Sequence, residues 1–99
     1  MKAHDILRAA QGHMRDRAST YDKPAGERSM AATVKAFQAV TGVYLSEEQG
    51  WLFMGLLKMV RSQQGFYRAD NYEDLAAYAA LQGEAAHATR AHDEMLEHG

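Results

Sequence analysis

Three acidic residues gather within about two turns near the start of the last predicted helix. Asp70, Asp74 and Tyr78 recur every four residues and so share one face of that helix, with Glu73 beside them. Carboxylate oxygens are the ligands that magnesium takes, often with substrate phosphates completing its coordination. Asp70 and Asp74 are therefore candidate metal ligands, with Mg²⁺ as the one candidate cofactor. The alternative is that these carboxylates only stabilise the positive end of the helix dipole.

Two cations, Lys58 and Arg61, lie among apolar neighbours near the end of the preceding helix. Burying an unpaired charge is costly, so each cation should reach water or pair with an acid. Asp70 and Asp74 are the nearest acids across a short loop. One interpretation is a structural ion-pair network between the two helices. The other is that Lys58 and Arg61 bind a phosphate or another anion beside an acid-bound metal.

Three aromatic residues, Phe66, Tyr67 and Tyr72, cluster around the loop that joins these helices. Exposed aromatic side chains are typical of protein-binding patches. Packing in the core, or in an interface within a homo-oligomer, would explain the same cluster. We therefore treat the three residues as a candidate protein-interaction surface.

Composition excludes several classes of protein. The chain has 99 residues and no cysteine, so a disulfide scaffold, a thiolate zinc site and a cysteine nucleophile are ruled out. No serine-elbow, Walker, dinucleotide-binding or HExxH motif is present, so we assign no catalytic residue and expect a binding protein rather than an enzyme. The net charge of −2 disfavours direct binding to nucleic acid. No apolar run reaches membrane-spanning length and no signal-peptide pattern opens the chain, so we expect a cytoplasmic protein without membrane contact.

The elements that must position these residues are all helical. A single proline and the lack of strand-like alternation predict one all-α domain over residues 1–99, a compact four-helix arrangement with a long C-terminal helix. Ser46 and Gln49 form a capping-box pattern, Gly42 suits a helix C-cap, and Asp70 or Asn71 should cap the last helix. The helices are expected at about 3–17, 27–41, 47–64 and 72–94, with a loop over 18–26.

Two of these helices carry further predictions. From Trp51 to Val60 the apolar residues point in nearly every direction, which is typical of a central helix covered on most sides. The last helix is rich in alanine, and beyond about residue 85 it can bury little apolar surface. That end should fray or pack on a second chain. We therefore expect a homo-oligomer.

Three blocks of the sequence together resemble a family of small phage and prophage proteins of unknown function. The family pattern is a loop of YGDP type, a helix ending in LLKxAR, and then DxxxDxAxYA; here the blocks are Tyr21 to Met30, Leu56 to Arg61 and Asp70 to Leu81. The layout is similar, more distantly, to the all-α nucleotide pyrophosphohydrolases of the MazG kind, although their E-x-x-E motif is not reproduced. If the family has a ligand site, the resemblance places it at the matched positions, which are Tyr21, Lys58, Arg61, Asp70, Asp74 and Tyr78.

These features lead to three hypotheses on function. The first is a small phage- or prophage-encoded accessory protein, in the host cytoplasm, that binds a host protein or a nucleotide-like ligand and serves in host takeover or anti-defence. The second is a magnesium-dependent MazG-like nucleotide pyrophosphohydrolase, in which the metal would polarise a phosphate. The third is an acidic DNA-mimic inhibitor, since seven acidic residues and one arginine lie from residue 70 onward.

Overall fold

The computed structural model describes the backbone of residues 1–21 and 29–98 and the side chains of residues 1–17 and 29–90. Within these ranges the chain forms four helices and no strand, which confirms the all-α prediction. The helices are α1 (Ala3–Tyr21), α2 (Ser29–Thr41), α3 (Glu47–Ser62) and α4 (Ala69–His98). The long C-terminal helix is also confirmed. None of the described helices is long and apolar enough to cross a membrane.

Local capping signals set the ends of α2 and α3 as predicted. Gly42 adopts a φ of +77°, and its amide donates to the Gln38 carbonyl at 2.8 Å, closing α2. At the start of α3 the Ser46 hydroxyl accepts from the Gln49 amide at 3.1 Å, and the Gln49 side chain accepts from the Ser46 amide at 3.1 Å. Both halves of the capping box are therefore formed.

Two other helix boundaries differ from the prediction. The loop expected from residue 18 begins later, because α1 continues to Tyr21; residues 18–21 contain no glycine or proline that would stop the helix. The helix expected from Tyr72 begins at Ala69, so Asp70 and Asn71 lie in its first turn and neither caps it. Acidic residues in a first turn stabilise the helix dipole without being caps. Residues 22–28 of the predicted loop lie outside the described part of the chain.

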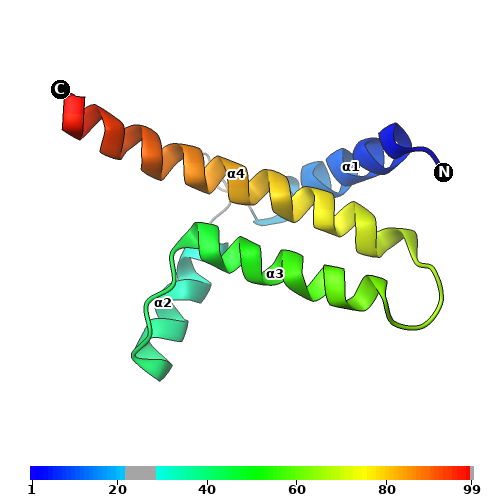
Figure 1. The fold of residues 1–99 in the computed structure, drawn as a ribbon, viewed down its shortest axis with the longest axis horizontal. Helices are drawn as coiled ribbons and strands as arrows, with labels where there is room; N and C mark the ends of the chain where they lie inside the picture. Colours follow the sequence, from blue (N-terminus) through cyan, green and yellow to red (C-terminus); the bar gives the residue numbers. More distant parts are fainter. Residues whose placement is uncertain (22–28, 99) are drawn as a thin grey trace.

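Helices α3 and α4 run side by side in opposite directions, joined by a short turn (Figure 1). Helix α1 packs on α4 and α2 packs on the start of α3, so α4 lies between α1 and α3. The last turns of α4 extend past the start of α3 (Figure 1). The helical backbone reaches His98, while the expected fraying or packing of this end on a second chain stays a prediction.

The buried core lies where α2, α3 and α4 meet. Its members are Met30, Val34, Trp51, Tyr78 and Leu81. Trp51 is 5% exposed and stacks on Tyr78 with 5.7 Å between the ring centroids. Gly50 lets α2 approach closely, because a Cβ atom there would lie 3.1 Å from the Val34 Cγ1 atom. Helix α1 also contacts this core, because the Arg17 guanidinium lies 5.7 Å from the centroid of the Tyr78 ring on α4.

The prediction that α3 is a central helix covered on most sides is wrong for this chain alone. Helix α4 covers one side of α3 and α2 covers its start, but a stripe of large apolar side chains remains exposed along the helix. Its members are Leu52, Phe53, Leu56, Met59 and Val60. The central position belongs to α4, whose many alanines allow α1 and α3 to pack on it from different sides.

A histidine ties α1 to α4. The His13 Nε2 atom lies 2.9 Å from the Glu73 carboxylate, and this hydrogen bond is the main reason why the pKa of His13 is raised. Desolvation of the ring lowers the pKa of His13, and the charges of Glu73, Asp74 and Asp16 add to the hydrogen bond in raising it. Because the folded pKa lies above the ordinary value of 6.5, protonated His13 stabilises the fold at low pH.

This ion pair predicts a pH-dependent stability. The contribution should be complete below pH 6.5 and should be lost as the pH rises through the folded pKa of His13. Thermal unfolding should show wild type more stable than His13→Gln at about pH 6, with a smaller gap at about pH 8. Gln11→Ala, at an exposed site of α1, serves as the control and should show the same gap at both pH values, because it removes no titratable group. An unchanged gap for His13→Gln would contradict the assignment.

Candidate functional site

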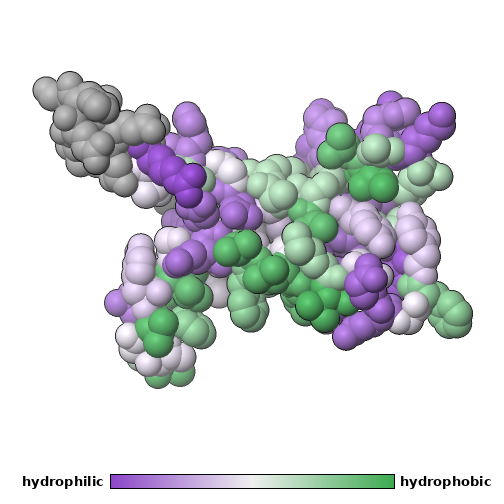
Figure 2. Space-filling view, viewed as in Figure 1, coloured by the Kyte–Doolittle hydropathy of each residue, from purple (hydrophilic) through white to green (hydrophobic). Residues whose placement is uncertain are grey.

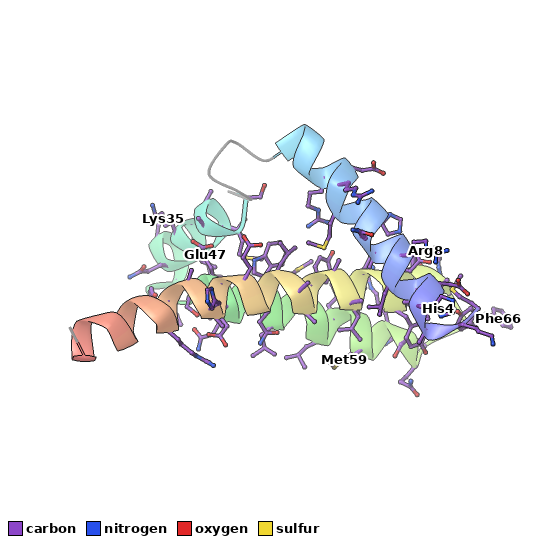
Figure 3. The ribbon with its side chains drawn as sticks, turned by 90° about the horizontal axis from the view of Figure 1, so that it is seen from above. His4, Arg8, Lys35, Glu47, Met59 and Phe66 are labelled. Atoms are coloured by element: carbon purple, nitrogen blue, oxygen red, sulfur yellow. The ribbon has the colours of Figure 1, made fainter. Side chains whose placement is uncertain are left out.

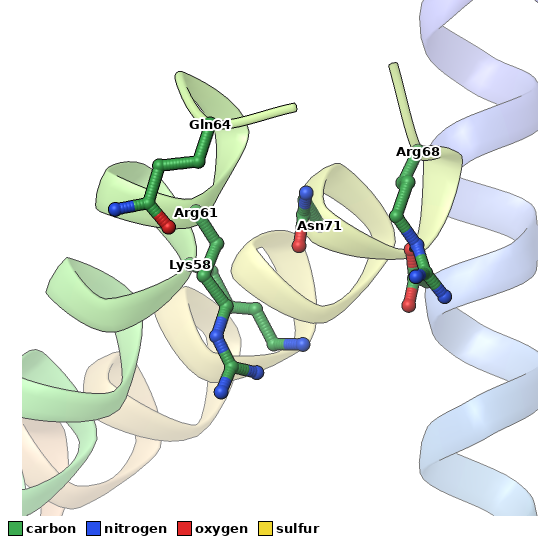
Figure 4. Close-up of a pocket in the computed structure, with 6 residues that line it drawn as sticks. Lys58, Arg61, Gln64, Arg68 and Asn71 are labelled. Carbon is green, nitrogen blue, oxygen red and sulfur yellow. The ribbon is translucent and has the colours of Figure 1, made fainter. Parts of the chain in front are cut away.

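A cationic pocket lies at the end of the hairpin where α3 passes into α4. Gly65, with a φ of +66°, helps to turn the chain there, a conformation that glycine adopts without steric cost. The pocket has a volume of about 310 Å³. One wall is formed by Lys58, Arg61 and Gln64 and the other by Arg68, Asp70 and Asn71 (Figure 4). We call this set the hairpin pocket.

The charges of the hairpin pocket are only partly compensated. The Lys58 ammonium, on a residue that is 9% exposed, lies 2.8 Å from the Asp74 carboxylate. Arg68 lies 3.4 Å from Asp70, and both of those side chains are well exposed. Arg61 forms no ion pair with any described residue. Three cations therefore face two carboxylates, which leaves a net charge of about +1 for an anion to balance.

Asn71 is the most unusual residue of the pocket. It is 6% exposed, yet its carboxamide makes no hydrogen bond to any described residue. Asn71 lines the hairpin pocket, and Figure 4 shows it between the Lys58 and Arg61 side chains on one side and Arg68 on the other. A buried polar group without a partner costs about 1–3 kcal/mol. Such a group is expected to have a partner, and the pocket is where that partner would lie.

The pocket contains the right donors for one oxyanion. The Arg61 guanidinium offers planar paired N–H groups that match a phosphate or carboxylate, and the amides of Asn71 and Gln64 can each donate to an oxygen. Lys58 contributes a positive charge from the buried side of the pocket. The structure thus brings Lys58 and Arg61 together on one wall, where the sequence predicted phosphate binding.

The sequence also predicted an ion-pair network, and for Lys58 this is what the structure shows, with Asp74 as its partner. The pocket residues Gln64, Arg68 and Asn71 were not predicted as site residues. A signal for Asn71 was present, because it stands seven residues before Tyr78, in register with the buried face of α4. A polar residue in a core register is a candidate for a buried polar contact.

The three carboxylates near the start of α4 each face a different basic side chain. Asp70 contacts Arg68, Asp74 contacts Lys58 and Glu73 contacts His13. Within the part of the chain that the structure describes, no three metal-ligating side chains come together. Magnesium binding by Asp70 and Asp74 stays a prediction.

Of the predicted ligand tyrosines, Tyr78 does not line the hairpin pocket. Tyr78 is 7% exposed and lies in the core against Trp51. The side chain of Tyr21 lies outside the described residues. Neither tyrosine therefore adds to the argument for the hairpin pocket.

The predicted protein-interaction aromatics lie at the turn between α3 and α4. Phe66 is 94% exposed and projects at the end of the molecule where α1 begins (Figure 3). Tyr67 stacks on the half-buried Tyr72 with 5.8 Å between ring centroids, and its hydroxyl contacts the Met1 sulfur at 3.9 Å. Tyr67 and Tyr72 thus hold the turn, and Phe66 is the exposed member of the cluster.

A family model described as a domain of unknown function, DUF6378, matches residues 5–86. The chain belongs to this family. The match includes every residue of the hairpin pocket, so the pocket is formed within the DUF6378 domain itself. It supports the predicted membership of a family of unknown function. A phage origin and a likeness to nucleotide pyrophosphohydrolases stay predictions.

Comparisons with curated proteins and with solved structures found no match to the chain.

Proposed function

We propose that this DUF6378 protein is a small binding protein whose hairpin pocket holds one anionic group of a nucleotide-like ligand. The observation that carries the proposal is the Asn71 carboxamide, 6% exposed and without a described partner, in the lining of a pocket with excess positive charge. Structural ion pairing explains Lys58 and Arg68, but it explains neither Arg61, which pairs with no described acid, nor the unpartnered amide of Asn71.

The chemistry favours a phosphate-bearing ligand. A phosphate presents several acceptor oxygens, enough for the Arg61 guanidinium, the Asn71 amide and the Gln64 amide at once. A carboxylate shares part of this chemistry but offers fewer acceptors. The pocket volume of about 310 Å³ is at the lower end of ligand pockets. Part of a nucleotide-sized ligand would therefore extend from the pocket into solvent.

The test is binding measured by titration calorimetry and by thermal unfolding. The probes are inorganic phosphate, pyrophosphate, acetate and the common ribo- and deoxyribonucleoside triphosphates, each with and without Mg²⁺. A probe at about one hundred times its Kd should stabilise the chain by about 2.7 kcal/mol, which moves the unfolding midpoint by about ten degrees or more. A phosphate-bearing probe should bind more tightly than acetate.

Two variants separate a ligand site from a structural role. Arg61→Gln should weaken binding by about 10- to 100-fold, the value of a charged hydrogen bond. Asn71→Leu should weaken binding while raising the free energy of unfolding of the empty protein, because it removes an unpartnered buried amide. Arg15→Gln, at an exposed site of α1, is the matched control and should bind like wild type.

Three results would count against this function. Binding of no probe by wild type would exclude an oxyanion site of useful affinity for these ligands. Equal binding by Arg61→Gln and wild type would place the site elsewhere. A shift that requires Mg²⁺ and disappears in Asp74→Asn would favour the metal-dependent pyrophosphohydrolase instead.

A further inference from the structure

A broad apolar face covers one side of α2 and α3. Its members are the exposed side chains Phe37, Val40, Val43, Leu52, Phe53, Leu56, Met59 and Val60. We call it the α2–α3 face. Figure 2 shows apolar side chains gathered over α3 and over α2 on the same side of the molecule. In the view from above, Met59 projects from the side of α3 that faces away from α1 (Figure 3).

The α2–α3 face contains a groove as well as a flat stripe. Between α2 and the start of α3 lies an almost entirely apolar hollow of about 410 Å³, lined among others by Phe37, Val43 and Phe53. Phe53 is 67% exposed and belongs both to this groove and to the stripe along α3. Groove and stripe therefore form one continuous apolar surface.

We propose that the α2–α3 face is the interface of a homodimer, in which α3 of one copy packs against α3 of the second copy about a two-fold axis. The face is distinct from the hairpin pocket, so the proposal does not rest on the proposed function. Cyclic dimers with such a self-complementary interface are the commonest soluble assemblies.

The area of the face matches what a stable dimer needs. Half-exposed large apolar side chains each present roughly 100 Å² to solvent, so the eight residues present roughly 800 Å² per copy. Stable interfaces bury about 800 Å² per partner, whereas the largest apolar patch on a typical monomer is about 300–600 Å². An uncovered face of this size would be a liability for a free monomer.

The pattern along α3 favours a second copy as the occupant. Leu52, Leu56 and Met59 follow the four-then-three spacing of a straight seam along one side of a helix, and Val60 lies one turn after Leu56 on the same side. Lys58 is the one charged residue from Trp51 to Val60, and it points away from the seam to Asp74. A seam without charge can pack on an identical seam without like-charge repulsion.

The apolar pattern of α3 and its exposure in the structure agree only if a second chain covers this helix. Helix α3 has apolar residues on nearly all sides, which predicts a helix that is covered on most sides. The chain's own α4 and α2 cover only part of it. A second copy of α3 would cover the remaining side.

The test is the mass of the full chain in solution, by light scattering after size exclusion and by sedimentation over a range of concentrations. Wild type should have twice the chain mass of 11.0 kDa. Leu56→Glu should have the single-chain mass and an unchanged helical circular-dichroism spectrum, because Leu56 is 48% exposed in the monomer. Leu7→Glu, at a 62% exposed leucine on α1, is the matched control and should remain a dimer.

A second measurement does not depend on Leu56→Glu being folded. The chain has no cysteine, so Leu56→Cys introduces a single thiol close to the proposed two-fold axis. Mild oxidation should yield a covalent dimer with Leu56→Cys and little of it with Leu7→Cys. Wild type that stays at the single-chain mass at every concentration would overturn the proposal and assign the face to a different protein. A dimer that persists in Leu56→Glu, or equal cross-linking at both thiols, would also overturn it.

Discussion

Truncation of Trp51 to alanine should lower the free energy of unfolding by about 3–5 kcal/mol, the largest loss that we expect from a single core residue. Trp51 is 5% exposed and is the central member of a core drawn from three helices. Its ring stacks on Tyr78, so the variant loses an aromatic contact and leaves a cavity at once. Since domains of this size have about 5–15 kcal/mol of stability, the variant should melt at a much lower temperature.

The measurement is urea unfolding followed by circular dichroism. Phe66→Ala is the matched control, because it removes an aromatic side chain that is 94% exposed, and it should change stability by less than about 0.5 kcal/mol. A loss of less than about 1 kcal/mol in Trp51→Ala would mean that the core around Trp51 collapses easily and does not hold α2, α3 and α4 together.

Helix number and type could be predicted because their signals are local. The capping box at Ser46 and the left-handed Gly42 need only a few neighbouring residues, and both are formed as expected. The start of α4 was placed too late, because the acids that seemed to cap it stabilise its first turn from inside the helix.

The prediction that α3 is covered on most sides was wrong because the sequence does not say which chain covers this helix. Apolar periodicity tells how much of a helix avoids water, but it does not tell which chain covers it. In the structure the side of α3 that carries Leu56 and Val60 is exposed, at 48% and 58%. The pattern was correct as a statement of apolar surface and wrong as a statement about packing within one chain.

The candidate site was predictable only in part. Lys58 and Arg61 are conspicuous as cations among apolar neighbours, and both line the hairpin pocket. The candidate site rests on the buried amide of Asn71 beside these cations, but the burial of Asn71 depends on how closely α3 and α4 pack. The direction of a buried amide is a tertiary property, and residue type and spacing do not determine it.

The ion pair between Lys58 and Asp74 leads to the second large effect. Asp74→Ala should lower the free energy of unfolding by about 2–3 kcal/mol, since it leaves the Lys58 ammonium buried without its partner at 2.8 Å. The expected cost is below that of a fully buried pair because 30% of the Asp74 side chain is exposed. Asp70→Ala, which breaks the exposed pair with Arg68, is the control and should cost less than about 1 kcal/mol.

A double variant tests whether the cost comes from the stranded charge. Lys58→Met combined with Asp74→Leu removes both charges and keeps apolar volume, so it should recover most of the stability that Asp74→Ala loses. Urea unfolding of Lys58→Met, Asp74→Leu and the double variant gives the coupling between the two residues. If Asp74→Ala cost no more than Asp70→Ala, Lys58 would be reaching water or an anion on its own. In that case Lys58 would belong with Arg61 as a ligand-binding cation of the hairpin pocket, and not with the ion pairs that hold α3 to α4.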